Sequence, residues 1–232
     1  MTQHVHGLPD PLPPDPLQVA EQWLKQAFDD QVQPNPNSMA LATVGANGQP
    51  TARIVLCKDI VLPAGYLVFY TNYESRKARE LAASPRACAL FHWDGLQRQV
   101  RVEGFVLKSP AAESDDYFAS RPWQSRVGAW ASQQSRPIGT RAQLIEQLRA
   151  AGKRFDTPPV GPDAREDDVG DDVEVPRPPH WGGYRLWAES VELWVEGPYR
   201  IHDRAQWTRT LTPVGDGHLF HASPWHVQRL QP

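Results

Sequence analysis

The chain has 232 residues, of which 24 are Lys or Arg and 27 are Asp or Glu, giving a formal net charge of −3. This length suits one domain built around a single core. The charge is uneven, because residues 156–175 hold eight acidic residues against Arg165, which leaves the rest of the chain at +4. A mildly basic body without a Lys/Arg stripe argues against nucleic-acid binding and favours a small anionic ligand.

The two cysteines and the N-terminal residues bear on the cellular compartment of the protein. Cys57 and Cys88 are too few to form a disulfide framework for this length, and their spacing matches no zinc motif, so no metal site is expected. The Pro-rich residues 1–14 lack the regions of a secretory signal, and no apolar run of about 18 residues follows. We expect a reduced cytoplasmic protein with a flexible segment at 1–14 and a single domain at 15–232.

The first predicted element is a helix. Asp15 can cap it, with Pro16 at its first position. Five apolar residues follow at helical spacing and are expected on its buried face: Leu17, Ala20, Leu24, Ala27 and Phe28.

Strands dominate the following hundred residues. Residues 39–44 and 51–58 flank Asn47-Gly48 and predict a β-hairpin, and residues 65–70, 87–93 and 99–107 predict further strands. In the last of these, Val100 and Val102 share one face while Arg101 and Glu103 share the other, as in a half-buried strand. Beyond residue 180, short runs such as YRLW and VELW predict additional strands.

Short helices separate these strands. They are expected at about 75–83, from Ser109-Pro110 to about 120, and from Thr140, which can form a capping box with Gln143. The acidic stretch at 156–175 predicts a flexible insertion. Many short strands with few helices predict a mainly β fold, a barrel with α decorations, and no phosphate-loop motif of the Rossmann or P-loop type is present.

Two clusters of polar residues suit a phosphate. Ser75, Arg76 and Lys77 lie in the first turn of a predicted helix, where free N–H groups favour an anion, although a solvated pair of cations is an equal alternative. Tyr117 and Arg121 stand four apart on one helix face, and Ser125 follows Pro122 in an expected loop. A guanidinium with two hydroxyls fits a phosphate monoester, whereas an Arg stacked on Tyr for packing is the alternative.

Two further groups are less clear. Arg53 and Lys58 are five residues apart, so either Lys58 lies past the strand end or the two serve different groups. Near the C-terminus, Trp194, Arg200, His202 and Arg204 lie within eleven residues of one another. Such a histidine is more often structural than catalytic.

Long motifs then show a resemblance that covers the chain from about residue 17 to the C-terminus, apart from 156–175. They are RIVLCK (53–58), FYTNYESRKARELA (69–82), RQVRVEG (98–104), YFASRPWQSRVGAWASQQS (117–135), PRPPHWGGYR (176–185) and RIHDR (200–204). In these motifs the sequence resembles the pyridoxamine 5'-phosphate oxidase family.

The resemblance implies an FMN-binding split β-barrel that works as a homodimer. It also implies oxidation of pyridoxamine and pyridoxine 5'-phosphate to pyridoxal 5'-phosphate, with oxygen as electron acceptor and hydrogen peroxide as product. The implied FMN contacts are Arg53, Ile54, Val55, Leu56, Cys57, Lys58, Tyr70, Thr71, Arg76, Lys77, Gln99, Gln134, Ser135, Trp194 and Arg204. The implied substrate contacts are Lys58, Tyr117, Arg121, Ser125, Arg200, Ile201 and His202, with Arg200 and His202 as the catalytic pair.

The sequence departs from the family pattern at Cys57 and Ile201, where Leu is usual, and at Arg126, where Gln is common. None of these departures removes an implied ligand. Three other functions are considered: a split-barrel flavin oxidase for another reduced heterocycle, as in phenazine biosynthesis; a non-catalytic carrier of flavin or pyridoxal phosphate; and a structural barrel whose nine Trp residues fill core and interface.

Overall fold

The computed structural model describes residues 7–162, 173–215, 217 and 219–232. The chain divides into two compact units. The first unit comprises Met1–Phe69, Ala83–Leu107 and Arg185–Pro232, and the second comprises Tyr70–Ala82 and Lys108–Tyr184. Each unit is described by itself below.

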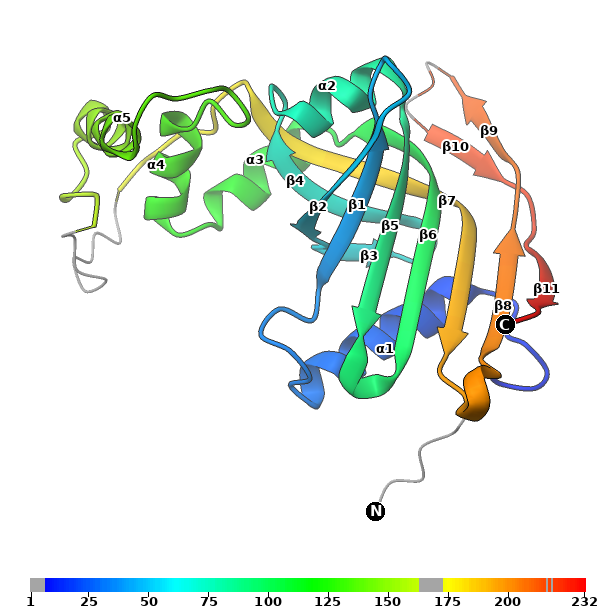
Figure 1. Ribbon diagram of the computed structural model, residues 1–232. Helices are drawn as coiled ribbons and strands as arrows, with labels where there is room; N and C mark the ends of the chain where they lie inside the picture. The colour runs from blue at the N-terminus through cyan, green and yellow to red at the C-terminus, as the bar shows by residue number, and fades with distance from the viewer. Residues whose placement is uncertain (1–6, 163–172, 216, 218) are drawn as a thin grey trace. The chain divides into compact units, whose positions relative to one another are not determined.

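Antiparallel strands form most of the first unit (Figure 1). The strands of the chain are β1 (Ser38–Val44), β2 (Pro50–Leu56), β3 (Asp59–Val61), β4 (Tyr66–Asn72), β5 (Arg86–Trp93), β6 (Arg98–Lys108), β7 (Trp181–Val195), β8 (Asp203–Thr208), β9 (Leu211–Val214), β10 (Leu219–Ala222) and β11 (His226–Leu230). The main sheet has the order β11-β8-β7-β6-β5-β1-β2, and β4 pairs with both β3 and β7. Strands β9 and β10 form a separate two-stranded sheet.

The interior of the first unit is built from alternating strands, β1, β5 and β6, together with strands such as β7 that are buried along most of their length. On β1, Met39 and Leu41 are fully buried, and on β6 Val100 and Val102 are fully buried, while the residues between them are partly exposed. Side chains on a strand alternate between faces, so one face of β1 and of β6 contributes to the core and the other remains polar. The mainly β fold with α decorations, the hairpin at Asn47-Gly48 and the face assignment of residues 99–107 are confirmed.

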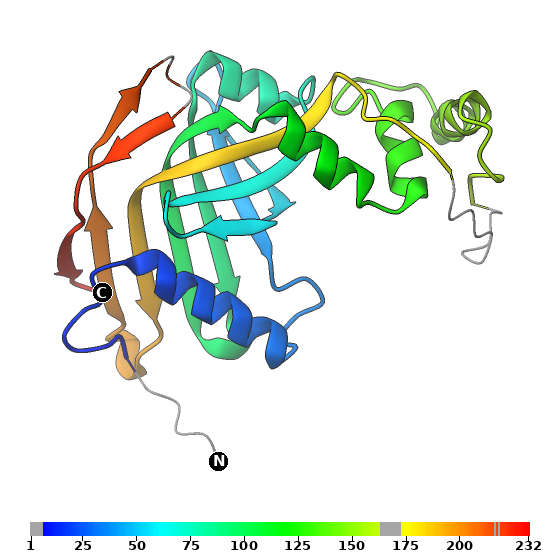
Figure 2. The same cartoon turned by 180° about the vertical axis from the view of Figure 1, so that it is seen from behind.

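Helix α1 (Pro16–Asp29) covers one side of the sheet, as Figure 2 shows from behind. The Asp15 carboxylate accepts a hydrogen bond from the Leu17 N–H at 2.9 Å, which confirms the predicted cap. Trp23 is buried, and the Arg98 guanidinium lies 4.8 Å from its ring centroid. Phe28, predicted on the buried face, is instead 49% exposed, whereas Trp23, which was not predicted there, is buried.

The N-terminal segment contacts β8 where it is described. Leu8 is buried and its N–H donates to the Asp203 carboxylate at 2.7 Å, and the Trp207 indole N–H donates to the Pro13 carbonyl at 2.9 Å. Residues 1–6 of the segment predicted to be flexible lie outside the described residues.

Gly104 on β6 lies close against the backbone of β7. A Cβ atom there would stand 1.8 Å from the Trp187 carbonyl oxygen and 3.0 Å from the Glu189 nitrogen. Because backbone cannot give way as a side chain can, we expect Gly104→Ala to lower the free energy of unfolding by about 3 kcal/mol. Urea unfolding followed by circular dichroism measures this change.

Gly128 provides the matched control for that substitution. It lies inside a helix and has no atom within 4 Å of an added Cβ. We expect Gly128→Ala to stabilise the protein by about 0.5–1 kcal/mol, since alanine is the better helix former. Equal effects of the two substitutions would contradict the strand contact at Gly104.

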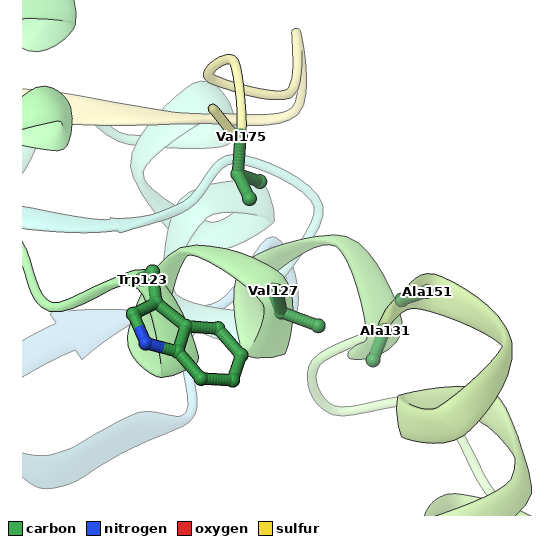
Figure 3. Close-up of a cluster of buried hydrophobic side chains, with 5 residues drawn as sticks. All are labelled: Trp123, Val127, Ala131, Ala151 and Val175. Atoms are coloured by element: carbon green, nitrogen blue, oxygen red, sulfur yellow. The ribbon is translucent and has the colours of Figure 1, made fainter. Parts of the chain in front are cut away.

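The second unit is mainly helical. Its helices are α2 (Arg76–Ala83), assigned with its last residue in the first unit, α3 (Ala111–Ala119), α4 (Trp123–Ala131) and α5 (Arg141–Arg154). Trp123, Val127 and Ala131 recur every fourth residue on α4 and form a small core with Ala151 of α5 and Val175 (Figure 3). The predicted capping box between Thr140 and Gln143 is present at the start of α5.

Two expectations change in this unit. Ser125 was expected in a loop after Pro122, but it lies in the first turn of α4, because Pro122 occupies the N-cap position and starts the helix rather than breaking it. Arg121 was expected at the end of a helix, but α3 ends at Ala119. Residues 163–172 of the acidic stretch lie outside the described residues, and Val175 near its end is buried.

Across the described parts of the chain, no helix combines the length and the apolar character that crossing a membrane would require.

Candidate functional site

A buried lysine organises the first polar group of the second unit. Lys77 on α2 is 7% exposed, and its ammonium donates to Thr71 Oγ1 at 2.9 Å, to Gln134 Oε1 at 3.1 Å and to Ser75 Oγ at 3.3 Å. We call these four residues the Lys77 group. A charge this deeply buried is costly unless polar atoms surround it. Strand β4, the residue before α2 and the segment after α4 each contribute an oxygen atom, so two predicted FMN contacts, Thr71 and Gln134, meet at a third, Lys77.

The neighbours of Lys77 have different surroundings. The Arg76 guanidinium forms an ion pair with Glu80 at 2.8 Å, and its side chain is 59% exposed. Arg76 and Lys77 were predicted to hold one phosphate together, and the structure pairs Arg76 with an acid of its own helix. Ser135, beside Gln134, is exposed and has a positive φ of 68°.

The second group of this unit consists of three stacked aromatic rings and one arginine. The Tyr70 and Tyr117 rings are stacked with centroids 3.9 Å apart, and Trp181 lies parallel to both, at 5.5 Å from Tyr70 and 6.2 Å from Tyr117. The Arg121 guanidinium lies 4.7 Å from the Trp181 ring centroid. We call these four residues the Arg121 group. An Arg stacked on Tyr was the packing alternative, but the rings beside the Arg121 guanidinium are Trp181 and, at 5.4 Å, Phe118.

Arg121 keeps unused hydrogen-bonding capacity. Its Nη1 atom is buried and has no hydrogen-bond partner within the described residues. Burial lowers the pKa of Arg121 below its usual range, and the nearby Tyr117 opposes this shift. A guanidinium remains charged at neutral pH after such a shift. A buried cationic N–H without a partner indicates a place for an anion.

The backbone of Trp181 is held by Arg177, which also forms an ion pair with Asp115. Arg177 donates to the Trp181 carbonyl oxygen at 2.7 Å and to the Asp115 carboxylate on α3 at 2.6 Å. The ring that supports Arg121 is therefore tied to the helix that carries Tyr117. Ser125, the third predicted member of the phosphate set, is exposed on the first turn of α4.

In the first unit, three predicted residues meet at the ends of β7 and β8. Trp194 stands opposite Arg204 in the strand register, and the His202 ring centroid is 4.6 Å from that of Trp194. Arg204 donates to Glu192 Oε1 through Nε at 3.0 Å and through Nη2 at 2.9 Å. Glu192, Trp194, His202 and Arg204 are called the Arg204 group below.

The connection before β8 holds the predicted catalytic pair. The Gly197 N–H donates to His202 Nδ1 at 3.2 Å, so the neutral ring carries its proton on Nε2. Tyr199 and Arg200 adopt left-handed backbone conformations, with φ of 57° and 64°. Residues other than glycine rarely adopt this conformation, which marks strain that functional loops often keep. Arg200 and Ile201 are exposed.

Residues 53–58 are distributed over two places in the first unit. Arg53 donates to Leu41 O at 3.1 Å and to the hydroxyls of Thr43 and Thr51, both at 2.5 Å, across the β1–β2 pair. Strand β2 ends at Leu56, so Lys58 lies past the strand end, which was one of the two alternatives. Lys58 lines a cavity of about 330 Å³ with α1 residues such as Leu24 and Phe28.

The side chains between Arg53 and Lys58 have different environments. Ile54 is 65% exposed on the outer strand of the sheet, and Val55 and Leu56 are partly exposed. Burial raises the pKa of the Cys57 thiol to about 12. Cys57 is therefore a neutral thiol at physiological pH and no nucleophile. Gln99 lies on the polar face of β6, opposite His92.

Sequence reasoning missed Glu192 and Trp181. Both lie on β7: Glu192 was read only as part of a strand, and Trp181 only as part of the motif at 176–185, and their importance comes from neighbours on other elements. A single acid within the apolar run VELW was the available signal for Glu192, because a buried carboxylate needs a cationic partner.

Among the described site residues, Arg121 thus combines a buried N–H that lacks a partner with flat aromatic rings beside it. Guanidinium and ammonium groups recognise phosphate, and aromatic faces suit planar rings. The fold defines the class, an antiparallel β-barrel protein with added helices, and the Arg121 group places a cation beside aromatic rings within it.

Comparison with known proteins identifies the family. Residues 24–150 match the profile described as pyridoxamine 5'-phosphate oxidase, and residues 181–232 match the pyridoxine 5'-phosphate oxidase C-terminal dimerisation region. A pyridoxine/pyridoxamine 5'-phosphate oxidase of Burkholderia cenocepacia is 47% identical over 219 residues, covering 94% of this chain and 90% of the relative. One of Paraburkholderia xenovorans is 48% identical over 218 residues, covering 94% and 89%. The chain belongs to the pyridoxamine 5'-phosphate oxidase family, a family of oxidases.

Solved structures confirm the predicted split barrel. PhzG from Burkholderia lata, crystallised with tetrahydrophenazine-1-carboxylic acid, aligns with a TM-score of 0.77 and 25% identity over 95% of this chain and 94% of that one. A pyridoxamine 5'-phosphate oxidase-related, FMN binding protein from Nostoc punctiforme aligns with a TM-score of 0.64 and 16% identity over 94% and 98%. The chain therefore has the split-barrel fold of a homodimeric family.

Proposed function

We propose that this protein is an FMN-dependent oxidase that converts pyridoxamine 5'-phosphate and pyridoxine 5'-phosphate to pyridoxal 5'-phosphate, with oxygen as electron acceptor and hydrogen peroxide as product. The observation that carries the proposal is Arg121, whose buried Nη1 has no partner within the described residues and whose guanidinium lies on Trp181 beside Tyr117. This arrangement fits the phosphate of a small aromatic monoester. The curated relatives at 47–48% identity carry the same activity in their names.

The residues present fit FMN as the cofactor. In the second unit, Lys77 with Thr71 and Gln134 offers a buried cation and hydroxyl and amide groups to an anion, with Tyr70, Arg76 and Ser135 nearby in the chain. In the first unit, Trp194 and Arg204 with Gln99 offer a ring, a guanidinium and an amide, and residues 53–58 complete the proposed contacts. Bound FMN supplies the hydride acceptor that no amino-acid side chain provides.

The chain's own residues then have to bind and orient the substrate. Tyr117, Arg121 and Ser125, with Lys58, hold its phosphate, and this fixed end positions the reacting carbon. Arg200 supplies positive charge beside the substrate ring. Since His202 Nδ1 accepts from the Gly197 N–H, its Nε2–H is the group that donates a hydrogen bond to a substrate oxygen. Arg200, whose guanidinium stays protonated, and His202, whose Nε2 already carries a proton, are therefore assigned to orienting the substrate rather than to accepting its proton.

The deciding experiment uses the purified protein. Its visible spectrum is recorded, pyridoxamine 5'-phosphate is added in air, and hydrogen peroxide and aldehyde are followed together. A yellow protein that forms both products supports the proposal. A protein that takes up no FMN, or a yellow protein inert to pyridoxamine and pyridoxine 5'-phosphate, contradicts it.

A second candidate function has one specific observation in its favour. PhzG, with a TM-score of 0.77, was crystallised with a tetrahydrophenazine carboxylic acid. A flavin oxidase for such a reduced heterocycle needs no phosphate-binding residues. The presence of Tyr117, Arg121 and Ser125 therefore favours the phosphorylated substrate. Reduction of the bound flavin by tetrahydrophenazine-1-carboxylic acid, but not by pyridoxine 5'-phosphate or pyridoxamine 5'-phosphate, would favour this candidate instead. A carrier would bind FMN or pyridoxal phosphate without turnover.

We also propose a homodimer and a cytoplasmic setting. The match of residues 181–232 to a dimerisation region supports a dimer of two identical chains, whose molar mass light scattering measures directly. Cys57 and Cys88 are free thiols, which suits a reducing compartment.

A further inference from the structure

Glu192 is a buried acid on a polar strand face. It lies on β7 between Val191 and Leu193, which are both fully buried, and alternation therefore directs its side chain to the opposite face. Although that face is polar, Glu192 is only 7% exposed. A carboxylate is rarely buried to this extent without a cationic partner, because its desolvation is costly.

Two guanidinium groups from the adjacent strands provide that partner. Glu192 Oε1 accepts from Arg204 Nε at 3.0 Å and from Arg204 Nη2 at 2.9 Å, a two-pronged contact that fixes the plane of the guanidinium. Glu192 Oε2 accepts from Arg101 Nη2. The carboxylate therefore bridges β8 and β6 across β7.

The third nitrogen of Arg204 is also held. Arg204 Nη1 donates to the Gln231 carbonyl oxygen at 3.0 Å. Arg204 thus has a single fixed orientation next to Trp194, its partner in the strand register. Gln99 lies two residues before Arg101 on the same face of β6. Three proposed FMN contacts, Gln99, Trp194 and Arg204, accordingly share a strand face with Glu192.

We propose that Glu192 is a positioning residue of the flavin site, which acts by holding the Arg204 guanidinium in the orientation that FMN binding requires. The inference rests on the proposed function, because it assumes that the protein binds FMN. Glu192 itself touches Arg101 and Arg204, and acts through Arg204. A fixed guanidinium loses less side-chain entropy when the ligand binds, which favours affinity.

Glu103 offers a matched control. It is also an acid on this strand face, and its carboxylate lies 3.4 Å from Arg101 Nε, but its contact is with Arg101 and not with Arg204. Replacing Glu103 by Gln therefore removes a similar charge from the same surface and leaves the Arg204 contact in place.

The experiment measures FMN affinity of the apoprotein by quenching of flavin fluorescence. We expect Glu192→Gln to raise the Kd for FMN about tenfold or more, the usual effect of losing a charge-assisted hydrogen bond, and Glu103→Gln to change it less than about twofold. In an Arg204→Ala background, Glu192→Gln should weaken FMN binding no further. A role in fold stability alone predicts instead that the two losses add.

Outcomes separate the two proposals. If the wild-type apoprotein takes up no FMN, the flavin function fails and this inference with it. If the wild type binds FMN but Glu192→Gln and Glu103→Gln have equal Kd values, or the Arg204 background shows additive losses, the inference alone is overturned. Should Glu192→Gln fold poorly, Glu192→Asp keeps the charge on a shorter side chain, and an FMN Kd equal to that of the wild type would overturn the inference as well.

Discussion

Arg121→Ala is expected to lower kcat/KM for pyridoxamine 5'-phosphate roughly 100-fold or more, the cost of removing a half-buried guanidinium from a phosphate. Both KM and kcat should worsen, because binding energy at the phosphate also positions the reacting carbon. Steady-state oxygen consumption in air measures both constants. The exposed Arg141 on α5 supplies the control, and Arg141→Gln should leave both constants unchanged.

Pyridoxamine without its phosphate tests the reason for that loss. Wild type and Arg121→Ala should oxidise it equally slowly, because pyridoxamine has no phosphate for Arg121 to bind. A large loss with pyridoxamine as well would assign Arg121 to the structure of the site rather than to phosphate recognition. Trp181→Leu removes the ring that lies 4.7 Å from the Arg121 guanidinium. Because Trp181 acts by supporting Arg121, the loss of kcat/KM in the double variant should be smaller than the product of the two single losses.

Lys77→Met is expected to raise the Kd for FMN roughly 100-fold or more, since it removes the buried cation of the Lys77 group while keeping a side chain of similar length. The oxygens of Thr71 and Gln134 that now accept from Lys77 would then face FMN without an intervening positive charge. Fluorescence titration of the apoprotein with FMN measures the constant directly.

Lys153 on α5 is exposed and serves as the control, so Lys153→Met should bind FMN as the wild type does. Thermal unfolding of each apoprotein separates lost affinity from lost fold. An unchanged Kd in a folded Lys77→Met protein would contradict the role given to the Lys77 group.

Features set by local chemistry were predicted well from the sequence. The cap at Asp15, the box at Thr140 and Gln143 and the alternation around Val100 each depend on residues close together in the chain, and all three are confirmed. Ser125 was misplaced because Pro122 can either end one element or begin the next, and only the packing of Trp123 and Val127 against α5 decides in favour of a helix.

Features set by distant partners could not be predicted. The role of Glu192 depends on which strands flank β7, and that of Trp181 depends on where Arg121 lies after α3 ends. The runs at 184–187 and 191–194 were each read as strand, but their union in one element required the pairing of β7 with its neighbours. The roles assigned to the site residues stay predictions, to be tested by the substitutions above.

The continuity of β7, from Trp181 to Val195, limits how this protein can change in length. One residue inserted or deleted around Ala188 would reverse every side chain that follows, moving Glu192 and Trp194 to the interior and Leu193 outward. The turn at Gly48 has open space around it and can lengthen without such a reversal. Insertions and fused tags should therefore be tolerated at the β1–β2 turn, whereas the length of β7 should be fixed in any functional variant.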